Sequence, residues 1–367
     1  MRIFAAILQL ALLMPCFGQS TPPLVSPEIR TDRTVTFRCR APNAKEVTVS
    51  GDFTRKPVPM SKDESGVWTA TLGPLTPDIY AYSIRVDGVA NIDSANPMVK
   101  TGFRGSSSGF VVPSDKPLDW DEQPVRHGTL HRHFYSSKAV GDARNFVVYT
   151  PPGYDSASKT RYPVLYLLHG SGDLSDSWSE FGKANFILDN LQAQGKARPM
   201  LVVMPFGHAS TGDGPDNRTR NVELFSKDLL EDIMPVVDKE YRTFADAQHR
   251  AIAGLSMGGG QSLWTGLNNP DKFAWVAGFS SGIRSTDVES RFPPLMKEPE
   301  NLNKKLKLLW IGVGKDDTLV EVNRQFTAAL KDKGVRFTYV ETEGGHTWRV
   351  WRRYLAELTP LLFRSTT

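Results

Sequence analysis

Short apolar runs alternate with longer amphipathic stretches through the last two thirds of this chain, and no other feature of the sequence restricts the fold so strongly. Runs in which nearly every residue is apolar are typical of strands that are covered on both faces of a sheet. Amphipathic stretches between such runs predict helices, and the alternation predicts a mostly parallel α/β sheet with helices on both faces. The predicted strands are residues 146–149, 164–168, 200–204, 251–253, 273–279, 308–313 and 337–340. The predicted helices are residues 180–192, 223–240, 257–268, 319–333 and 349–362.

The first third of the chain follows a different pattern. Apolar and polar side chains alternate there in short runs, as at Val35 and Phe37 or at Tyr80 and Tyr82, and Gly, Pro and Asp separate the runs. This pattern predicts a small antiparallel β-sandwich. A stretch rich in Gly, Ser and Pro follows and has the composition of a linker. The predicted parts are a sandwich over residues 22–104, a linker over 105–124 and an α/β domain over 125–367.

The amino terminus has the three parts of a secretory signal peptide. Met1 and Arg2 carry positive charge, residues 3–14 are apolar, and small residues stand at positions −3 and −1 of a cleavage site after Gly18. The apolar run has only twelve residues, too few to cross a bilayer core of about 30 Å. We therefore expect residues 1–18 to be a signal peptide and the mature protein to be secreted or periplasmic, with no membrane contact after cleavage.

Composition excludes several kinds of protein. The 44 Lys and Arg residues nearly balance the 40 Asp and Glu residues, and no basic run is present, so we expect no nucleic-acid partner. Two cysteines exclude a disulfide scaffold, a zinc ribbon and an iron–sulfur site. His131 and His133 would share a face of a strand, but no third ligand stands nearby. We expect no metal and no cofactor.

Ser256 lies in a glycine-rich turn between a predicted strand and a predicted helix. Gly254 and Gly258 flank it in the pattern G-x-S-x-G. A turn this tight has no room for side chains two positions before and after the serine, and it lifts the hydroxyl above the sheet edge. The following helix directs free N–H groups to the same point. The sequence therefore predicts Ser256 as a nucleophile.

A serine hydroxyl needs a base that takes its proton, and in this kind of sheet the order along the chain is serine, acid, histidine. His346 is the only one of seven histidines that follows Ser256, and it lies in a glycine-rich loop. The acid is expected after the predicted strand 308–313, where Asp316 and Asp317 are adjacent. The residues alone leave these two open, because a shift of one position reverses the side-chain direction.

An oxyanion hole requires two backbone donors. One predicted donor is the N–H of Met257, the residue after the nucleophile. The other is expected in the loop that follows strand 164–168, where Gly170 and Ser171 can turn an amide inward. We expect His169, in the same loop, to be a packing residue.

These residues resemble carbohydrate esterase family 1, the feruloyl and acetylxylan esterases, and the wider esterase D group. The resemblance covers nearly all of residues 126–363 and implies an α/β-hydrolase fold with a serine, histidine and aspartate triad. The family pattern G-x-x-D matches Gly314 and Asp317 and implies that Asp317 is the acid. The other matching segments are Arg126-His-Gly-Thr, Tyr149-Thr-Pro-Pro-Gly-Tyr, Tyr162-Pro-Val-Leu-Tyr-Leu-Leu-His-Gly, Gly254-Leu-Ser-Met-Gly-Gly and Gly345-His-Thr-Trp.

The first part of the chain resembles the early-set, immunoglobulin-like modules related to family 48 carbohydrate-binding modules. Gly66-Val-Trp and the segment 80–88 carry this likeness. Starch-binding members place a Trp soon after a Gly-x-Phe segment, whereas no Trp follows Gly51-Asp-Phe here. We therefore expect Trp68 and Tyr82 in the sandwich core, and a packing or substrate-lid role for the module in preference to glycan binding.

A feruloyl group is a flat aromatic, and a pocket for it would offer aromatic faces. Arg218 and Arg220 stand in a predicted loop where they could contact a sugar or a carboxylate. The candidate substrate-binding residues, each in or beside a predicted site loop, are Trp348, Trp178, Phe206 and Trp351.

The resemblance implies a serine esterase that acts on feruloyl or acetyl esters of plant cell-wall polysaccharide or oligosaccharide, and the predicted signal peptide implies that it is secreted. An alternative is a siderophore esterase of the enterobactin type, in which a β-sandwich also precedes a related hydrolase domain. Its triscatecholate substrate carries several negative charges and requires a basic site. A third interpretation is a non-catalytic glycan-binding protein on a hydrolase fold, and the intact Ser256, Asp317 and His346 disfavour it.

Overall fold

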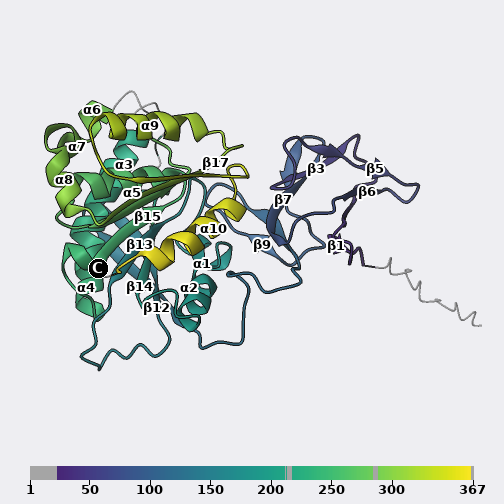
Figure 1. Ribbon diagram of the computed structural model, residues 1–367. Helices are drawn as coiled ribbons and strands as arrows, with labels where there is room; N and C mark the ends of the chain where they lie inside the picture. The colour runs from purple at the N-terminus through teal and green to yellow at the C-terminus, as the bar shows by residue number, and fades with distance from the viewer. Residues whose placement is uncertain (1–22, 211, 213–216, 284–287, 365–367) are drawn as a thin grey trace, which may run out of the picture.

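The computed structural model describes residues 23–210, 212, 217–283 and 288–364, so the predicted signal peptide lies outside the described residues. The described chain forms a β-sandwich and a larger α/β part, which lie side by side in Figure 1. Within these residues no helix is both long and apolar enough for a membrane crossing.

Two antiparallel sheets form the amino-terminal sandwich, with strand orders β1-β2-β6-β5 and β4-β3-β7-β10-β9, and β8 pairs with β7. Alternate side chains point inward, and the rings of Phe37, Tyr82 and Phe110 pack within 6 Å of one another. Trp68 and Tyr82 are buried in this core, as expected. The strands are β1 (Glu28–Ile29), β2 (Val35–Arg40), β3 (Val47–Gly51), β4 (Val58–Pro59), β5 (Ser61–Lys62), β6 (Val67–Leu72), β7 (Asp78–Val86), β8 (Val89–Asn91), β9 (Val99–Lys100) and β10 (Ser107–Val112).

The predicted linker over residues 105–124 is wrong in part, because β10 lies inside it. β10 pairs with β7 and β9, and Phe110 enters the sandwich core. Its small residues suggest a linker by composition, but they serve close packing. A Cβ atom at Gly109 would stand 3.1 Å from side-chain atoms of Met98 and Phe181. The sandwich therefore extends to residue 112.

An eight-stranded sheet forms the centre of the α/β part, in the order β11-β12-β14-β13-β15-β16-β17-β18. The pairs from β14 to β18 are parallel, and β11 and β12 add an antiparallel edge. The fully buried central strands match the apolar runs that predicted them. The strands are β11 (Thr129–Ser137), β12 (Asp142–Thr150), β13 (Val164–Leu168), β14 (Leu201–Pro205), β15 (Arg250–Gly254), β16 (Trp275–Phe279), β17 (Leu308–Gly314) and β18 (Thr338–Thr342).

Helices cover both faces of this sheet, as the alternating pattern predicts (Figure 1). One core joins the sheet to α1, α2 and α10, and a second core joins its other face to α3, α4, α5 and α9. The helices are α1 (Ser177–Glu180), α2 (Ala184–Ala193), α3 (Asn217–Asp228), the π-helical turn η1 (Leu229–Ile233), α4 (Met234–Glu240), η2 (Ala247–His249), α5 (Met257–Asn268), α6 (Val288–Arg291), α7 (Pro293–Lys297), α8 (Pro299–Lys305), α9 (Val320–Asp332), α10 (Trp348–Leu358) and η4 (Thr359–Leu361).

Two helical regions differ from the prediction. The helix expected over 180–192 is divided into α1 and α2, because Gly182 packs tightly on Trp178 and Trp348 and Lys183 adopts a positive φ of 57°. Helices α6 to α8 were not predicted, since each is short and two of them begin at proline.

A buried ion pair joins the sandwich to the α/β part. The Arg352 side chain of α10 is fully buried, and its Nη2 atom donates to Asp78 Oδ1 of β7 at 2.7 Å. The same guanidinium donates to the carbonyls of Phe181 and Ile79, at 3.0 and 2.5 Å. The acceptors of this buried cation therefore belong to both parts: Asp78 and Ile79 to the sandwich, and Phe181 to the α/β part.

We predict that Arg352→Met lowers the free energy of unfolding by about 3 kcal/mol or more, because it leaves the buried Asp78 carboxylate without its closest partner. Urea denaturation of the full chain measures this loss. Asp115→Asn is the matched control, because it removes an ion pair with Arg33 in which the aspartate is 92% exposed. Such a surface pair contributes little. Equal effects of the two substitutions would contradict the role of the buried pair.

Candidate active site

Ser256 occupies the sharp turn between β15 and α5, with φ 52° and ψ −113°. A Cβ atom at Gly254 would lie 2.5 Å from the Gly258 carbonyl oxygen, and one at Gly258 would lie 2.4 Å from that of His169. Side chains at these two positions would therefore clash with backbone. The Ser256 N–H donates to the Phe279 carbonyl at 2.8 Å, which ties the turn to β16.

His346 connects Ser256 to an aspartate. Its Nε2 atom lies 2.9 Å from Ser256 Oγ, and its Nδ1 atom lies 3.0 Å from both carboxylate oxygens of Asp317. Asp316 instead turns outward and pairs with Arg55 of the sandwich at 2.6 Å. The structure thus brings together the three residues chosen from the sequence and the family pattern, and it places Asp317 inward.

Asp317 is buried and well supplied with hydrogen-bond donors. Burial alone would raise its pKa, but the hydrogen bond from His346, together with those from the Ser280 hydroxyl and the Leu319 N–H, holds the pKa below its usual value. Trp351 Nε1 donates to Ser280 Oγ at 3.0 Å and so fixes that hydroxyl. The carboxylate is therefore ionised and oriented toward the imidazole.

The predicted substrate contacts Trp178, Trp348 and Trp351 are wrong: all three are at most 5% exposed and belong to the core beneath the site. Helix α10 is amphipathic, and its apolar face packs on the sheet. The Trp351 ring packs edge-on against His346 with centroids 4.9 Å apart. Trp351 therefore supports the imidazole directly, and Trp348 packs against Trp351 with ring centroids 5.6 Å apart.

Phe206 was the fourth predicted substrate contact. Its ring packs against Phe103 of the sandwich and against His208, with centroids 5.3 and 5.4 Å apart. Phe206 is not among the described residues that line the cavity, whereas His208 is.

A cavity of about 520 Å³ opens above Ser256 and His346. Its apolar wall includes Trp264, Ile283 and Leu319, none of which the sequence singled out, because they come from distant elements and carry no motif. Arg218, a sequence candidate, lines this cavity, whereas Arg220 is exposed on α3. The lining residues are Arg104, Ser171, His208, Ser210, Gly212, Asn217, Arg218, Asn221, Val222, Ser256, Met257, Gly260, Trp264, Gly282, Ile283, Arg291, Phe292, Thr318, Leu319 and His346.

The expected oxyanion donors lie beside the nucleophile. Met257 is the first residue of α5, so its N–H has no partner within the helix. Ser171 lines the cavity with Met257. Gly170 lies close by, where a Cβ atom would stand 3.6 Å from Ser256 Cβ, but it is not among the described residues that line the cavity. Ser171 is therefore the better placed second donor.

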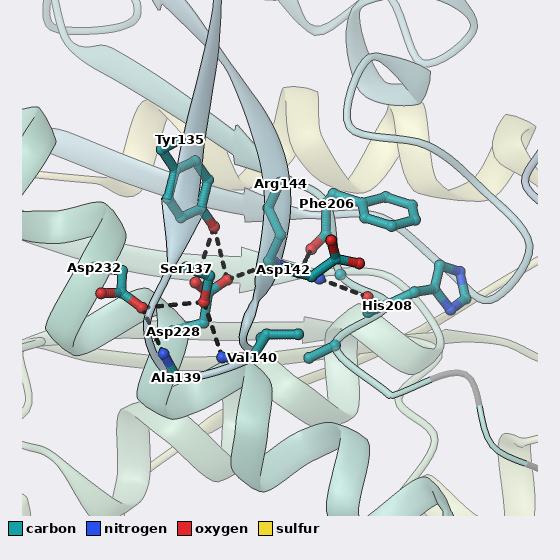
Figure 2. A network of polar contacts seen from close by, with 12 residues as sticks. Tyr135, Ser137, Ala139, Val140, Asp142, Arg144, Phe206, His208, Asp228 and Asp232 are labelled. Atoms are coloured by element: carbon teal, nitrogen blue, oxygen red, sulfur yellow. Dashed lines mark hydrogen bonds and ion pairs between the residues drawn. The ribbon is translucent and has the colours of Figure 1, made fainter.

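A buried polar network holds the loop that carries His208 (Figure 2). Arg144 donates to the carbonyl oxygens of Phe206 and His208, and its Nε atom pairs with Asp228 at 2.9 Å. Asp228 is fully buried and also accepts from the Tyr135 hydroxyl. The site wall at His208 is therefore anchored from inside the α/β part.

His131 and His133 do share a face of β11, but each Nε2 atom has a protein partner. His131 Nε2 lies 3.1 Å from Thr150 Oγ1, and His133 Nε2 lies 2.5 Å from the Tyr241 hydroxyl. Within the part of the chain that the structure describes, no group of three or more His, Cys, Asp or Glu side chains is arranged for a metal ion.

Comparisons with known proteins agree with this division of the chain. Residues 137–362 match the model of the Esterase family, and residues 25–98 match carbohydrate-binding module 48, the isoamylase N-terminal domain. An endo-1,4-beta-xylanase/feruloyl esterase of Xylanibacter ruminicola is 32% identical over 92% of this chain and 46% of its own length. The chain spans about half the length of the curated relatives that it matches first.

Solved structures give the same fold. A ferulic acid esterase of carbohydrate esterase family 1 from Anaeromyces mucronatus is 25% identical, with a TM-score of 0.59 over 68% of this chain and 96% of that chain. The enterobactin esterase of Shigella flexneri is 19% identical, with a TM-score of 0.65 over 89% of this chain and 92% of that chain. At that identity the second likeness concerns the fold alone. The α/β-hydrolase fold and both family resemblances are confirmed.

We predict that the stability of the protein falls as the pH is lowered from about 6.5 toward 4. Burial lowers the pKa of both His169 and His208 from 6.5 to about 4. Between these values the unfolded chain binds more protons than the folded chain, so protonation favours unfolding. The melting temperature, measured by differential scanning fluorimetry from pH 7 to 4.5, should fall by several degrees. His208→Gln should make this dependence shallower, and an unchanged slope would contradict the assignment.

Proposed function

We propose that this member of the Esterase family is a carboxylic ester hydrolase that acts on feruloyl or acetyl esters of plant cell-wall polysaccharide or its oligosaccharides. Ser256 is the nucleophile in this proposal, His346 the general base and acid, and Asp317 the residue that orients the imidazole. The observation that carries the proposal is the continuous chain of contacts from Asp317 through His346 to Ser256 Oγ.

Acylation begins at the serine hydroxyl. His346 Nε2, 2.9 Å from Ser256 Oγ, takes the hydroxyl proton while the oxygen attacks the ester carbonyl carbon. Asp317, with its lowered pKa, stays ionised and stabilises the imidazolium that forms. The imidazolium then gives the proton to the departing sugar oxygen, and the acyl group stays on Ser256.

Charge develops on the carbonyl oxygen in each tetrahedral intermediate. Met257 and Ser171 line the cavity together with Ser256, and their N–H groups would donate to this oxygen. Water then attacks the acyl-enzyme by the same route in reverse: His346 takes the water proton and returns it to Ser256, releasing the acid.

The substrate class is supported by the relatives and by the cavity. The Xylanibacter ruminicola relative is named as a xylanase and feruloyl esterase, and the likeness extends over nearly the whole chain. A cavity of about 520 Å³ with Trp264, Ile283 and Phe292 in its wall suits an aromatic acyl group or a short sugar. The composition of residues 1–18 supports action outside the cytoplasm, secreted or periplasmic.

Asp317→Asn should lower kcat for methyl ferulate by about 10⁴, because an amide at this position leaves the imidazole in the wrong tautomer. Asp316→Asn is the matched control, since that carboxylate faces Arg55 and not the imidazole. Steady-state kinetics of both variants measure the difference, and circular dichroism checks that both are folded. Equal activities would remove Asp317 from the mechanism.

A second candidate is the hydrolysis of a triscatecholate siderophore ester. The observation that favours it is the charge of the cavity wall: the described lining residues include Arg104, Arg218 and Arg291 and no Asp or Glu. A multiply negative substrate gains from such a wall. Methyl ferulate and xylan acetate carry no such charge.

Hydrolysis of three substrates by the purified full chain should distinguish these candidates. We expect methyl ferulate or acetylated xylan to be cleaved with a higher kcat/KM than a triscatecholate lactone, and Ser256→Ala to abolish cleavage by four or more orders of magnitude. Arg104→Gln should change kcat/KM for neutral methyl ferulate less than twofold. Preferential cleavage of the lactone, weakened by Arg104→Gln and by salt, would favour the siderophore ester instead.

A further inference from the structure

The segment of the sandwich domain that follows β9 crosses the loop after β13, which carries the second oxyanion donor. The Phe103 N–H donates to the Gly172 carbonyl at 2.7 Å. The two backbones touch closely, since a Cβ atom at Gly102 would stand 2.8 Å from the same carbonyl oxygen. This contact lies one residue after Ser171.

A buried ion pair also holds the loop after β13, at Asp173. Lys100 Nζ lies 2.5 Å from Asp173 Oδ1, and the two side chains are 16% and 8% exposed. The ammonium also lies over the rings of Phe181 and Trp348, 5.8 and 5.9 Å from their centroids. The Asp173 N–H donates to the Gly170 carbonyl at 3.3 Å and closes the turn that contains Ser171. Lys100 therefore holds the residue that closes this turn.

A third contact fixes Gly172 through a histidine. The Phe103 ring stacks on His208 with centroids 4.8 Å apart and ring planes 23° apart. His208 Nε2 accepts from the Gly172 N–H at 3.2 Å. The stacked Phe103 ring holds this imidazole, and Arg144 holds the backbone carbonyl of His208 (Figure 2). Both backbone groups of Gly172 are therefore bonded, its N–H to His208 and its carbonyl to Phe103.

We propose that the sandwich domain is a structural part of the catalytic centre, in which Lys100 and Phe103 are positioning residues that hold the Ser171 N–H where the oxyanion forms. The proposal rests on the esterase function proposed above. The contacts at Gly170 and Gly172 bracket Ser171, and a catalytic donor must be held within about 0.5 Å of its productive position. Loss of one oxyanion donor costs about 10²–10³ in kcat, so a loosened donor should cost part of this.

The test compares variants of the full chain. Lys100→Met leaves a buried carboxylate unpaired, so it is studied alone and together with Asp173→Asn, which removes that charge. In the double variant we expect a folded protein with kcat for methyl ferulate lowered 10- to 100-fold and KM changed less than threefold. Lys100→Arg should recover part of kcat.

Binding of a transition-state mimic separates positioning from general stability. A boronic acid that forms a tetrahedral adduct with Ser256 should bind the double variant more weakly by about the same factor as the loss of kcat, because only the adduct uses the oxyanion donors. Thr76→Val is the matched control. This substitution removes the hydrogen bond from Arg349 Nη2 to Thr76 Oγ1, a 2.6 Å contact that also crosses the domain boundary. It should leave kcat and boronate affinity unchanged.

A folded double variant with the kcat and boronate affinity of the wild type would overturn the proposal, and so would an equal loss in Thr76→Val. Failure of the esterase function itself gives a different result. In that case the wild-type protein would cleave no ester and would not be labelled by a serine-directed phosphonate.

Discussion

The lack of space around two glycines determines how this site is assembled. At Gly258 the carbonyl oxygens of Leu168 and His169 stand within 2.7 Å of where a Cβ atom would be, so the end of β13 meets the first turn of α5 backbone to backbone. A Cβ atom at Gly254 would likewise clash with the Gly258 carbonyl in the first turn of α5. This contact places the loop after β13 beside the first N–H groups of α5, with Ser256 between them. A side chain at Gly254 or Gly258 would push the turn at Ser256 away from the loop after β13.

The histidine is held by the hydrophobic core as much as by its polar partners. Trp351 packs edge-on against the imidazole and also donates to Ser280, whose hydroxyl bonds to Asp317. Trp178 and Trp348 lie behind it with ring centroids 5.0 Å apart. Aromatic residues that lie close to the triad thus serve to fix it, while the apolar wall of the cavity comes from Trp264 of α5 and from residues outside helices, such as Ile283 and Leu319.

The sequence predicted those features that depend on local pattern or on order along the chain. The apolar runs identified the sheet, the glycines around Ser256 identified the turn, and the order of residues identified His346. Asp316 and Asp317 could not be separated by periodicity, because the turn after β17 decides which one faces inward. The family pattern selected Asp317, which is the one that contacts His346 in the structure.

Other features depend on packing between distant segments, which no local pattern records. Trp178, Trp348 and Trp351 lie near the site loops in sequence, but the amphipathic face of α10 buries them. β10 resembles a linker in composition, but its Gly109 is small because it packs closely against Met98 and Phe181. Lys100 ends β9 and Arg104 lies between β9 and β10, and their places at the site depend on how the two parts pack together.

The buried Arg352 also bears on how such a protein can change over evolutionary time. Its guanidinium lies within the α/β part, yet two of its acceptors, Asp78 and the Ile79 carbonyl, belong to the sandwich. A buried cation needs its acceptors, so a hydrolase that lost this module would have to replace Arg352 as well. Recombination at the boundary would then preserve stability only where both sides of this pair are exchanged together.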